Sequence, residues 1–165
     1  MAHAVVRTDN LSGTIDGSRL LSLVAETNID NGNIVVRGVK AEGERETYIA
    51  TAPEGAVGAD KAILVAGVEM DYEGYKNLDE YYNAAGDKFR GYLLKGGDEF
   101  SVTADAFANA SAAPTAVDAD TRAYVATSEG ATKLTVVNTA ENALGEIVAV
   151  EAEGGYVYYV IRVAN

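Results

Sequence analysis

Turn signals built on glycine and asparagine recur along this chain so often that they leave no room for a long helix. The sequence contains 17 glycines, and glycines or β-branched residues interrupt nearly every alanine-rich stretch. Short runs rich in valine, isoleucine, threonine and tyrosine fill the intervals, and such runs are typical of strands. The sequence therefore predicts a mainly β protein, a small barrel or sandwich of about 8–9 short strands with one short helix and an N-terminal arm.

The expected strands come in a regular series after residue 33. The segments that carry the strand pattern are 34–37, 45–51, 62–66, 88–94, 99–103, 121–126, 133–137, 145–151 and 156–163. Residues 62–66 form a continuous apolar run, which favours a strand buried on both faces. Three hairpins are expected: 88–94 with 99–103, 121–126 with 133–137, and 145–151 with 156–163.

The one short helix is expected at residues 77–86. Asn77 is a good N-cap, and Glu80 follows at the spacing of a capping box. Gly86 is a suitable stop signal. A helix of about two turns is marginal by itself, so it must pack against the rest of the domain.

Residues 1–27 differ from the β-rich domain at 28–165. Their apolar side chains occur singly or in pairs, and no single period fits them. Such a segment must bury these groups against something else. Two interpretations stay open: a strand and loop lying on its own domain, or an arm that docks on a partner chain. Residues 18–25 fit a two-turn helix as well as an extended strand.

Charge and composition exclude several classes of function. The net charge is −12, which disfavours binding to nucleic acid and to anionic membrane surfaces. The chain has no cysteine and a single histidine, so disulfides, thiolate metal sites and histidine-rich metal sites are not expected. No apolar run reaches the roughly 18 residues of a membrane span, and the first residues lead us to expect no ordinary signal peptide.

The sequence indicates no active site. It contains neither a phosphate-binding loop nor a nucleophile elbow, and His3 is interpreted as incidental, near a mobile terminus. The many carboxylates are interpreted as a solvated surface. Residues 118–120 and 30–32 resemble only fragments of a calcium loop. We therefore expect no catalytic residue, no cofactor and no metal ligand, and we expect that the chain is not an enzyme.

Ten tyrosines are the most distinctive aromatic feature. Seven of them fall in two groups, Tyr72, Tyr75, Tyr81 and Tyr82 near the expected helix, and Tyr156, Tyr158 and Tyr159 on the last strand. Tyrosine combines apolar area with a polar tip, so it suits partly hydrated protein interfaces. Packing in the core and a carbohydrate-binding platform are the two alternatives.

Most of the chain resembles small proteins of tailed bacteriophages that decorate the head. The resemblance is carried by segments 5–25, 29–38, 45–52, 91–103 and the terminal hairpin. It implies a capsid decoration (head cement) protein that binds the outside of the shell and stabilises contacts between major capsid subunits. Such a protein would be made in the host cytoplasm and reside on the exterior of the virion. Many are trimers, so a homotrimer is a further expected association.

Under this resemblance the N-terminal segment would contact the capsid. The residues expected to be buried in that interface are Val5, Val6, Leu11, Ile15, Leu20 and Leu21. Strand addition and apolar contact would supply the binding without any chemistry. The alternatives are a minor tail or baseplate component and a glycan-binding surface module.

Overall fold

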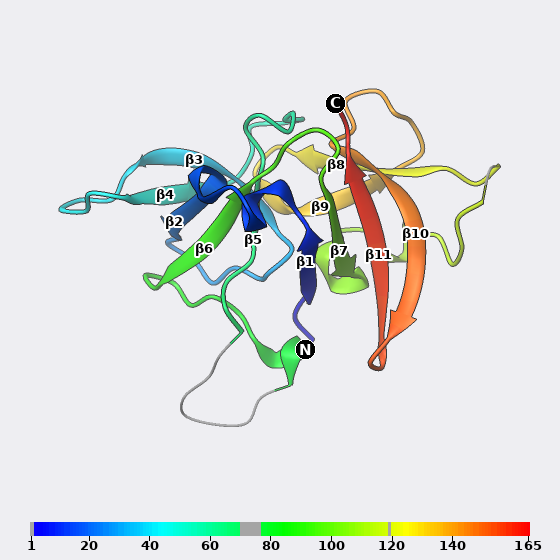
Figure 1. Ribbon diagram of the computed structural model, residues 1–165, viewed down its shortest axis with the longest axis horizontal. Helices are drawn as coiled ribbons and strands as arrows, with labels where there is room; N and C mark the ends of the chain where they lie inside the picture. The colour runs from blue at the N-terminus through cyan, green and yellow to red at the C-terminus, as the bar shows by residue number, and fades with distance from the viewer. Residues whose placement is uncertain (1, 70–76, 119) are drawn as a thin grey trace.

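Five strands close into a small barrel in the computed structural model, which describes residues 2–69, 77–118 and 120–165 (Figure 1). The barrel strands are β2 (Leu20–Val24), β3 (Ile34–Lys40), β4 (Thr47–Thr51), β5 (Ile63–Val65) and β6 (Lys88–Leu93). Their order around the barrel is β2-β4-β3-β5-β6. Only β2 and β4 run parallel, and the other neighbours pair antiparallel.

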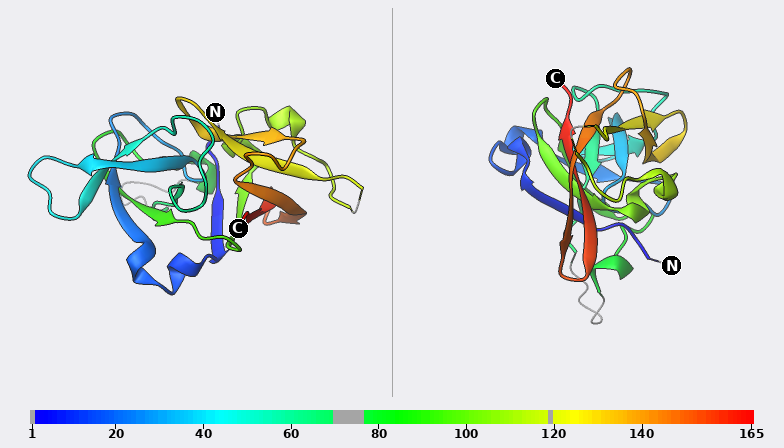
Figure 2. Two further views of the ribbon diagram at one scale, coloured as in Figure 1. Left: turned by 90° about the horizontal axis from the view of Figure 1, so that it is seen from above. Right: turned by 90° about the vertical axis from the view of Figure 1, so that its right-hand side faces the viewer.

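The remaining strands form an antiparallel sheet beside the barrel, as the view from above in Figure 2 shows. Its six strands are β1 (Val6–Asn10), β7 (Glu99–Thr103), β8 (Ala123–Ser128), β9 (Ala131–Val137), β10 (Gly145–Glu153) and β11 (Tyr156–Val163). The order across the sheet is β1-β7-β11-β10-β8-β9. The expected mainly β fold with a small barrel is therefore confirmed, with eleven strands in the described residues.

Alternation along the barrel strands divides the apolar side chains between two cores. Val35 and Ile63 are buried in a cluster inside the barrel, whereas Ile34 and Leu64 belong to a larger cluster that continues into the six-stranded sheet. Phe100 of β7 is one of the sheet residues in that larger cluster. Successive side chains of a strand point to opposite faces, so β5 is buried on both sides, as its apolar run predicts.

Two of the three expected hairpins are confirmed. β8 pairs with β9 across the turn at Gly130, and β10 pairs with β11 across Gly154 and Gly155. These three glycines have positive φ angles of 70°, 60° and 88°. Only glycine adopts such a backbone conformation without a steric penalty, which explains the turn signals in the sequence.

The expected hairpin between residues 88–94 and 99–103 is wrong. β6 pairs with β2 and β5 in the barrel, whereas β7 pairs with β1 and β11 in the sheet. The Asp98 carboxylate organises the crossing between them, because it accepts hydrogen bonds from the backbone N–H of Lys95 (2.9 Å) and Ser12 (3.1 Å). A turn signal identifies a change of direction but does not identify the partner of the next strand.

The expected helix at 77–86 is shortened to a single 3-10 turn, η3 (Leu78–Glu80). Its capping interaction is present, since the backbone N–H of Asn77 donates to Glu80 Oε2 at 2.8 Å. The chain then extends, because Asn83 pairs with Ile29 through backbone hydrogen bonds of 2.9 Å in both directions. Four further 3-10 turns are η1 (Ser12–Thr14), η2 (Gly17–Arg19), η4 (Ala104–Ala106) and η5 (Ala110–Ala112).

The N-terminal 27 residues contribute to both sheets. β1 pairs with β7 at the edge of the six-stranded sheet, and β2 is a member of the barrel. Strands from residues 1–27, the segment expected to be an arm beside the domain at 28–165, therefore pair within both sheets. Most apolar residues of this segment pack against its own chain, as in the first of the two interpretations, whereas Ile15 and Leu20 stay exposed. No helix among the described residues has both the length and the apolar character that a membrane crossing requires.

Candidate interaction surface

The six residues expected at a capsid interface do not share one environment. Val5 and Leu11 are each only 2% exposed, so they are unavailable to a partner in this conformation. Val6 and Leu21 are half-buried. Val6 packs against the core shared by the barrel and the sheet, and Leu21 packs against the core inside the barrel.

Ile15 and Leu20 remain on the surface, with 92% and 38% of their area exposed. Ile15 lies between η1 and η2 in the loop that connects the two halves of the molecule, and Leu20 begins β2. An isolated exposed leucine is common on protein surfaces. An isoleucine exposed to this extent is informative only if the loop that carries it is held in place.

The loop that carries Ile15 is anchored at both ends. Ser12 donates from its backbone N–H and its hydroxyl to the two carboxylate oxygens of Asp98, at 3.1 and 3.0 Å. Arg19 donates to the backbone carbonyl oxygens of Leu93 and Leu94, at 3.3 and 3.0 Å. These contacts hold the loop against both ends of the β6–β7 connection.

Close packing and a local cap add to this anchoring. A Cβ atom on Gly13 would lie 2.9 Å from Cδ1 of Tyr92, so only glycine allows the loop to approach that ring. Asp16 accepts from the backbone N–H of Ser18 at 3.0 Å and from its hydroxyl at 2.7 Å. These hydrogen bonds lower the pKa of Asp16. The loop therefore presents Ile15 in a preorganised conformation.

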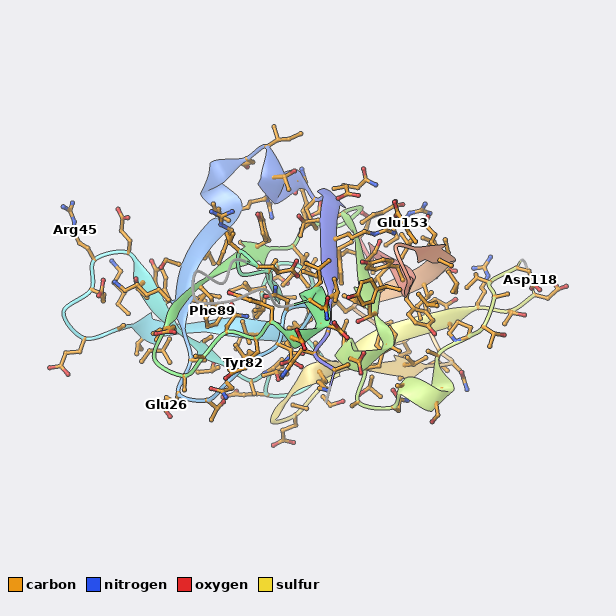
Figure 3. The ribbon with its side chains drawn as sticks, turned by 90° about the horizontal axis from the view of Figure 1, so that it is seen from below. Glu26, Arg45, Tyr82, Phe89, Asp118 and Glu153 are labelled. Carbon is orange, nitrogen blue, oxygen red and sulfur yellow. The ribbon has the colours of Figure 1, made fainter. Side chains whose placement is uncertain are left out.

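A groove of about 770 Å³ is lined by residues of β2, of the start of β4 and of the start of β6, with Leu20 and Leu21 among them. Its basic lining residues are Lys40, Arg45, Lys88 and Arg90. Figure 3 shows Arg45 at the far end of the β3–β4 connection and Phe89 within the barrel. Because the whole chain carries a charge of −12, this group of cations reverses the prevailing sign locally.

Tyr48, Tyr81 and the carboxylate of Glu46 also line the groove. The guanidinium carbon of Arg37 and the ammonium of Lys40 lie 5.1 and 5.8 Å from the centre of the Tyr48 ring. Lys88 pairs with Glu44 at 2.7 Å. The groove thus combines cations with apolar side chains, and Ile15 precedes its lining residue Leu20 by five positions in the chain. We refer to Ile15, Leu20 and this groove as the barrel-side surface.

His3, for which no functional role is expected, contacts two other segments of the chain. Its Nδ1 lies 2.7 Å from Asp30 Oδ1, and its ring centre is 5.0 Å from that of Tyr82. Its backbone N–H donates to the carbonyl oxygen of Asp79 at 2.7 Å. The N-terminal segment is thus fixed beside η3, as Figure 1 shows. Spacing in the sequence gives no indication of these contacts.

The tyrosines divide between the core and the surface. Tyr158 and Tyr159 are buried, whereas Tyr82 is 38% exposed. Tyr156 donates its hydroxyl to Asp79 Oδ1 at 3.2 Å, and burial together with this carboxylate raises the pKa of Tyr156. Tyr72 and Tyr75 lie outside the described residues. The described members of the two groups do not form one aromatic platform.

Among the described residues, no three histidine or carboxylate side chains are grouped as a metal site would require. Asp118 belongs to one of the two calcium-like fragments. Its carboxylate instead accepts hydrogen bonds from the backbone N–H groups of Asp120 (2.9 Å) and Thr121 (2.8 Å). These hydrogen bonds lower the pKa of Asp118. The carboxylate therefore stabilises its own loop.

Comparison with known proteins places the chain among phage-derived proteins. No curated protein and no solved structure matches it. One protein-family model, described as YonC prophage protein, matches residues 13–148. That match covers the whole barrel and the position of Ile15, and in the six-stranded sheet it covers β7, β8, β9 and the start of β10. The chain belongs to the YonC prophage protein family.

Proposed function

We propose that this protein is a non-catalytic structural component of the phage particle that binds the outer surface of the head. Its partner is the major capsid protein, and its role is to stabilise contacts between adjacent capsid subunits. The membership of a prophage protein family supports a phage-related role. The observation that carries the finer proposal is Ile15, 92% exposed on an anchored loop.

A clamp between subunits needs contact area on rigid elements and does not need reactive groups. The loop at residues 11–19 is held before binding, so little conformational entropy is lost when Ile15 is buried by a partner. The groove lined by Leu20 supplies cations for the carboxylates of that partner. Charge complementarity then fixes the orientation of the bound protein, while the apolar contact supplies affinity.

The environments of the reactive side chains also favour a non-catalytic role. The single histidine pairs with Asp30 and packs against Tyr82. Glu69 is half-buried, and burial raises its pKa, but it accepts a hydrogen bond from the buried Asn31 at 3.3 Å. Both groups are engaged in contacts between segments of the chain.

The proposal is tested by rebinding to particles of the inducible phage from which this gene has been deleted. We expect the purified protein to saturate these particles, and we expect Ile15→Asp to bind at least about tenfold more weakly, because it places a charge in an apolar contact. Val39→Asp is the matched control, since Val39 is 74% exposed and lies outside the groove lining. Thermal unfolding of both variants should match that of the unmodified protein.

Two results would contradict the proposal. The first is failure of the unmodified protein to bind the deleted particles. The second is equal binding by the Ile15→Asp variant, which would remove the barrel-side surface from the interface.

A further inference from the structure

The outer half of β10 is a strand edge without a partner. β10 extends over nine residues, but β8 pairs only with Gly145, Glu146 and Ile147. A register irregularity between Ile147 and Ala149 leaves Val148 unmatched where β8 departs. From this point to Glu153, β10 has a backbone partner on one side only, β11, among the described residues. Figure 1 shows the β10–β11 hairpin projecting beyond the neighbouring strands.

Other edges of the same sheet are protected. Along β9, Ala108 donates to the carbonyl oxygen of Leu134 at 2.8 Å, and the Asn109 side chain satisfies both backbone groups of Val136. β1 has only five residues and an irregular register between Arg7 and Asn10. Short or covered edges prevent unwanted strand pairing. The outer half of β10 has neither protection.

The turn geometry identifies which backbone groups are available. Glu153 and Tyr156 flank the two-residue turn, so they form its hydrogen-bonded pair. Hydrogen-bonded and non-bonded positions alternate along an antiparallel ladder. Val150 and Ala152 therefore direct their N–H and C=O groups away from β11, toward the open edge.

The hairpin is held in position for binding. Arg7 of β1 forms ion pairs with Glu151 and Glu153 across the face of the sheet. Its guanidinium carbon lies 4.2 Å from the centre of the Tyr158 ring. Tyr156 also joins the hairpin to Asp79. An edge fixed by these contacts loses little entropy when another strand pairs with it.

We propose that residues 148–153 bind an extended, positively charged segment of a partner protein as an added β-strand. This inference goes beyond the proposed function and does not depend on it. Main-chain hydrogen bonds to Val150 and Ala152 supply the pairing, and side chains at alternate positions supply the selectivity.

The charges on this edge determine the kind of partner. The side chains of Glu151 and Glu153 are 50% and 70% exposed, and one arginine faces the two carboxylates. A strand with cations at alternate positions would balance the remaining charge. The opposite face carries Ala152 and the 49% exposed Val157, which accept apolar side chains.

A second copy of this chain is a poor occupant of the same edge. A symmetric antiparallel pair centred on Glu151 would place the two copies of this glutamate opposite each other, and like charges in that position are destabilising. Each copy also carries a net charge of −12. Repulsion between the copies therefore opposes self-pairing.

The test is a titration of isotopically labelled protein, followed by amide NMR, with a capped hexapeptide of alternating lysine and valine. We expect saturable binding, with a dissociation constant below about 1 mM and the largest shifts at the Val150 and Ala152 amides. A matched peptide of alternating glutamate and valine should give no saturable shifts. Added salt should weaken the binding of the lysine peptide.

Two variants sharpen the result. Ala152→Pro removes one outward N–H while leaving the β10–β11 ladder intact, since proline is tolerated where the N–H faces solvent. It should reduce affinity at least about tenfold. Ala152→Thr keeps the N–H and should bind as the unmodified protein does. Three results with the unmodified protein would each overturn the proposal. They are no binding of the lysine peptide, amide shifts located away from residues 148–153, and equal binding of the glutamate peptide.

Discussion

Two asparagines perform the same task in the two halves of the molecule, in different surroundings. Beside the barrel, Asn31 donates to the carbonyl oxygen of Gly67 at 3.1 Å and accepts from the Gly67 N–H at 2.8 Å. At the edge of the sheet, Asn109 makes the same pair of hydrogen bonds with Val136, at 2.9 and 2.8 Å. Each side-chain amide thus makes, for one residue, the two backbone hydrogen bonds that a neighbouring strand would otherwise make.

The two sites differ in their access to water. Asn31 is fully buried and also accepts from Asn83 Nδ2 at 3.0 Å, whereas Asn109 is half-buried. A Cβ atom on Gly67 would lie 2.1 Å from Asn83 Oδ1, so the buried network also requires glycine at this position. Water can replace a lost partner at the sheet edge but not in the buried network. This difference should appear directly in the free energy of unfolding.

The largest effect is expected for Asn31→Ala. The variant leaves both buried backbone groups of Gly67 without a partner, so we expect a loss of about 3 kcal/mol in the free energy of unfolding, measured by denaturant titration. Asn28→Ala is the control, because the exposed Asn28 accepts a single hydrogen bond, from the Ala85 N–H at 2.9 Å. Equal losses in the two variants would contradict the proposed importance of burial.

A smaller effect is expected for Asn109→Ala, about 1 kcal/mol, because water reaches the freed groups of Val136. The variant also uncovers the β9 edge, so sedimentation should detect concentration-dependent self-association. Asn109→Asp keeps the oxygen that accepts from the Val136 N–H and should show a weaker form of both effects. A fully monomeric Asn109→Ala variant would show that this amide does not protect the edge.

The smallest effect is expected for Glu69→Gln, and it depends on pH. Burial raises the pKa of Glu69 in the folded state, although the Asn31 hydrogen bond opposes this shift. The unmodified protein therefore loses stability relative to the variant as pH rises above about 4.3, the ordinary value for this group. At neutral pH we expect Glu69→Gln to be more stable by less than about 1 kcal/mol. Thermal unfolding of both proteins at pH 4 and pH 7 measures their difference in stability. The same difference at both pH values would contradict the prediction.

Local patterns were sufficient to predict the class of fold. The turns at Gly130 and at Gly154–Gly155 could be identified because their positive φ angles depend on residues adjacent in the chain. The burial of β5 follows from its continuous apolar run. In each case the physical cause lies within a few residues of the effect.

Partners distant in the chain could not be predicted in the same way. Asn31 and Gly67 are separated by 36 positions, and Asn109 and Val136 by 27. The change of sheet between β6 and β7 depends on Asp98 meeting Ser12 from the N-terminal segment. The sequence predicts Ile15 at an interface, but the anchoring of its loop rests on Asp98, Leu93 and Leu94, which no local motif connects to it.

The most direct test of the account is the copy number of this chain in purified phage particles, measured by quantitative mass spectrometry against the major capsid protein. A ratio within a few-fold of one is the result that head binding predicts, because a protein that stabilises contacts between capsid subunits must occupy sites across the shell. A trace amount would favour a minor tail or baseplate component. Complete absence from the particles would contradict a structural role in the virion.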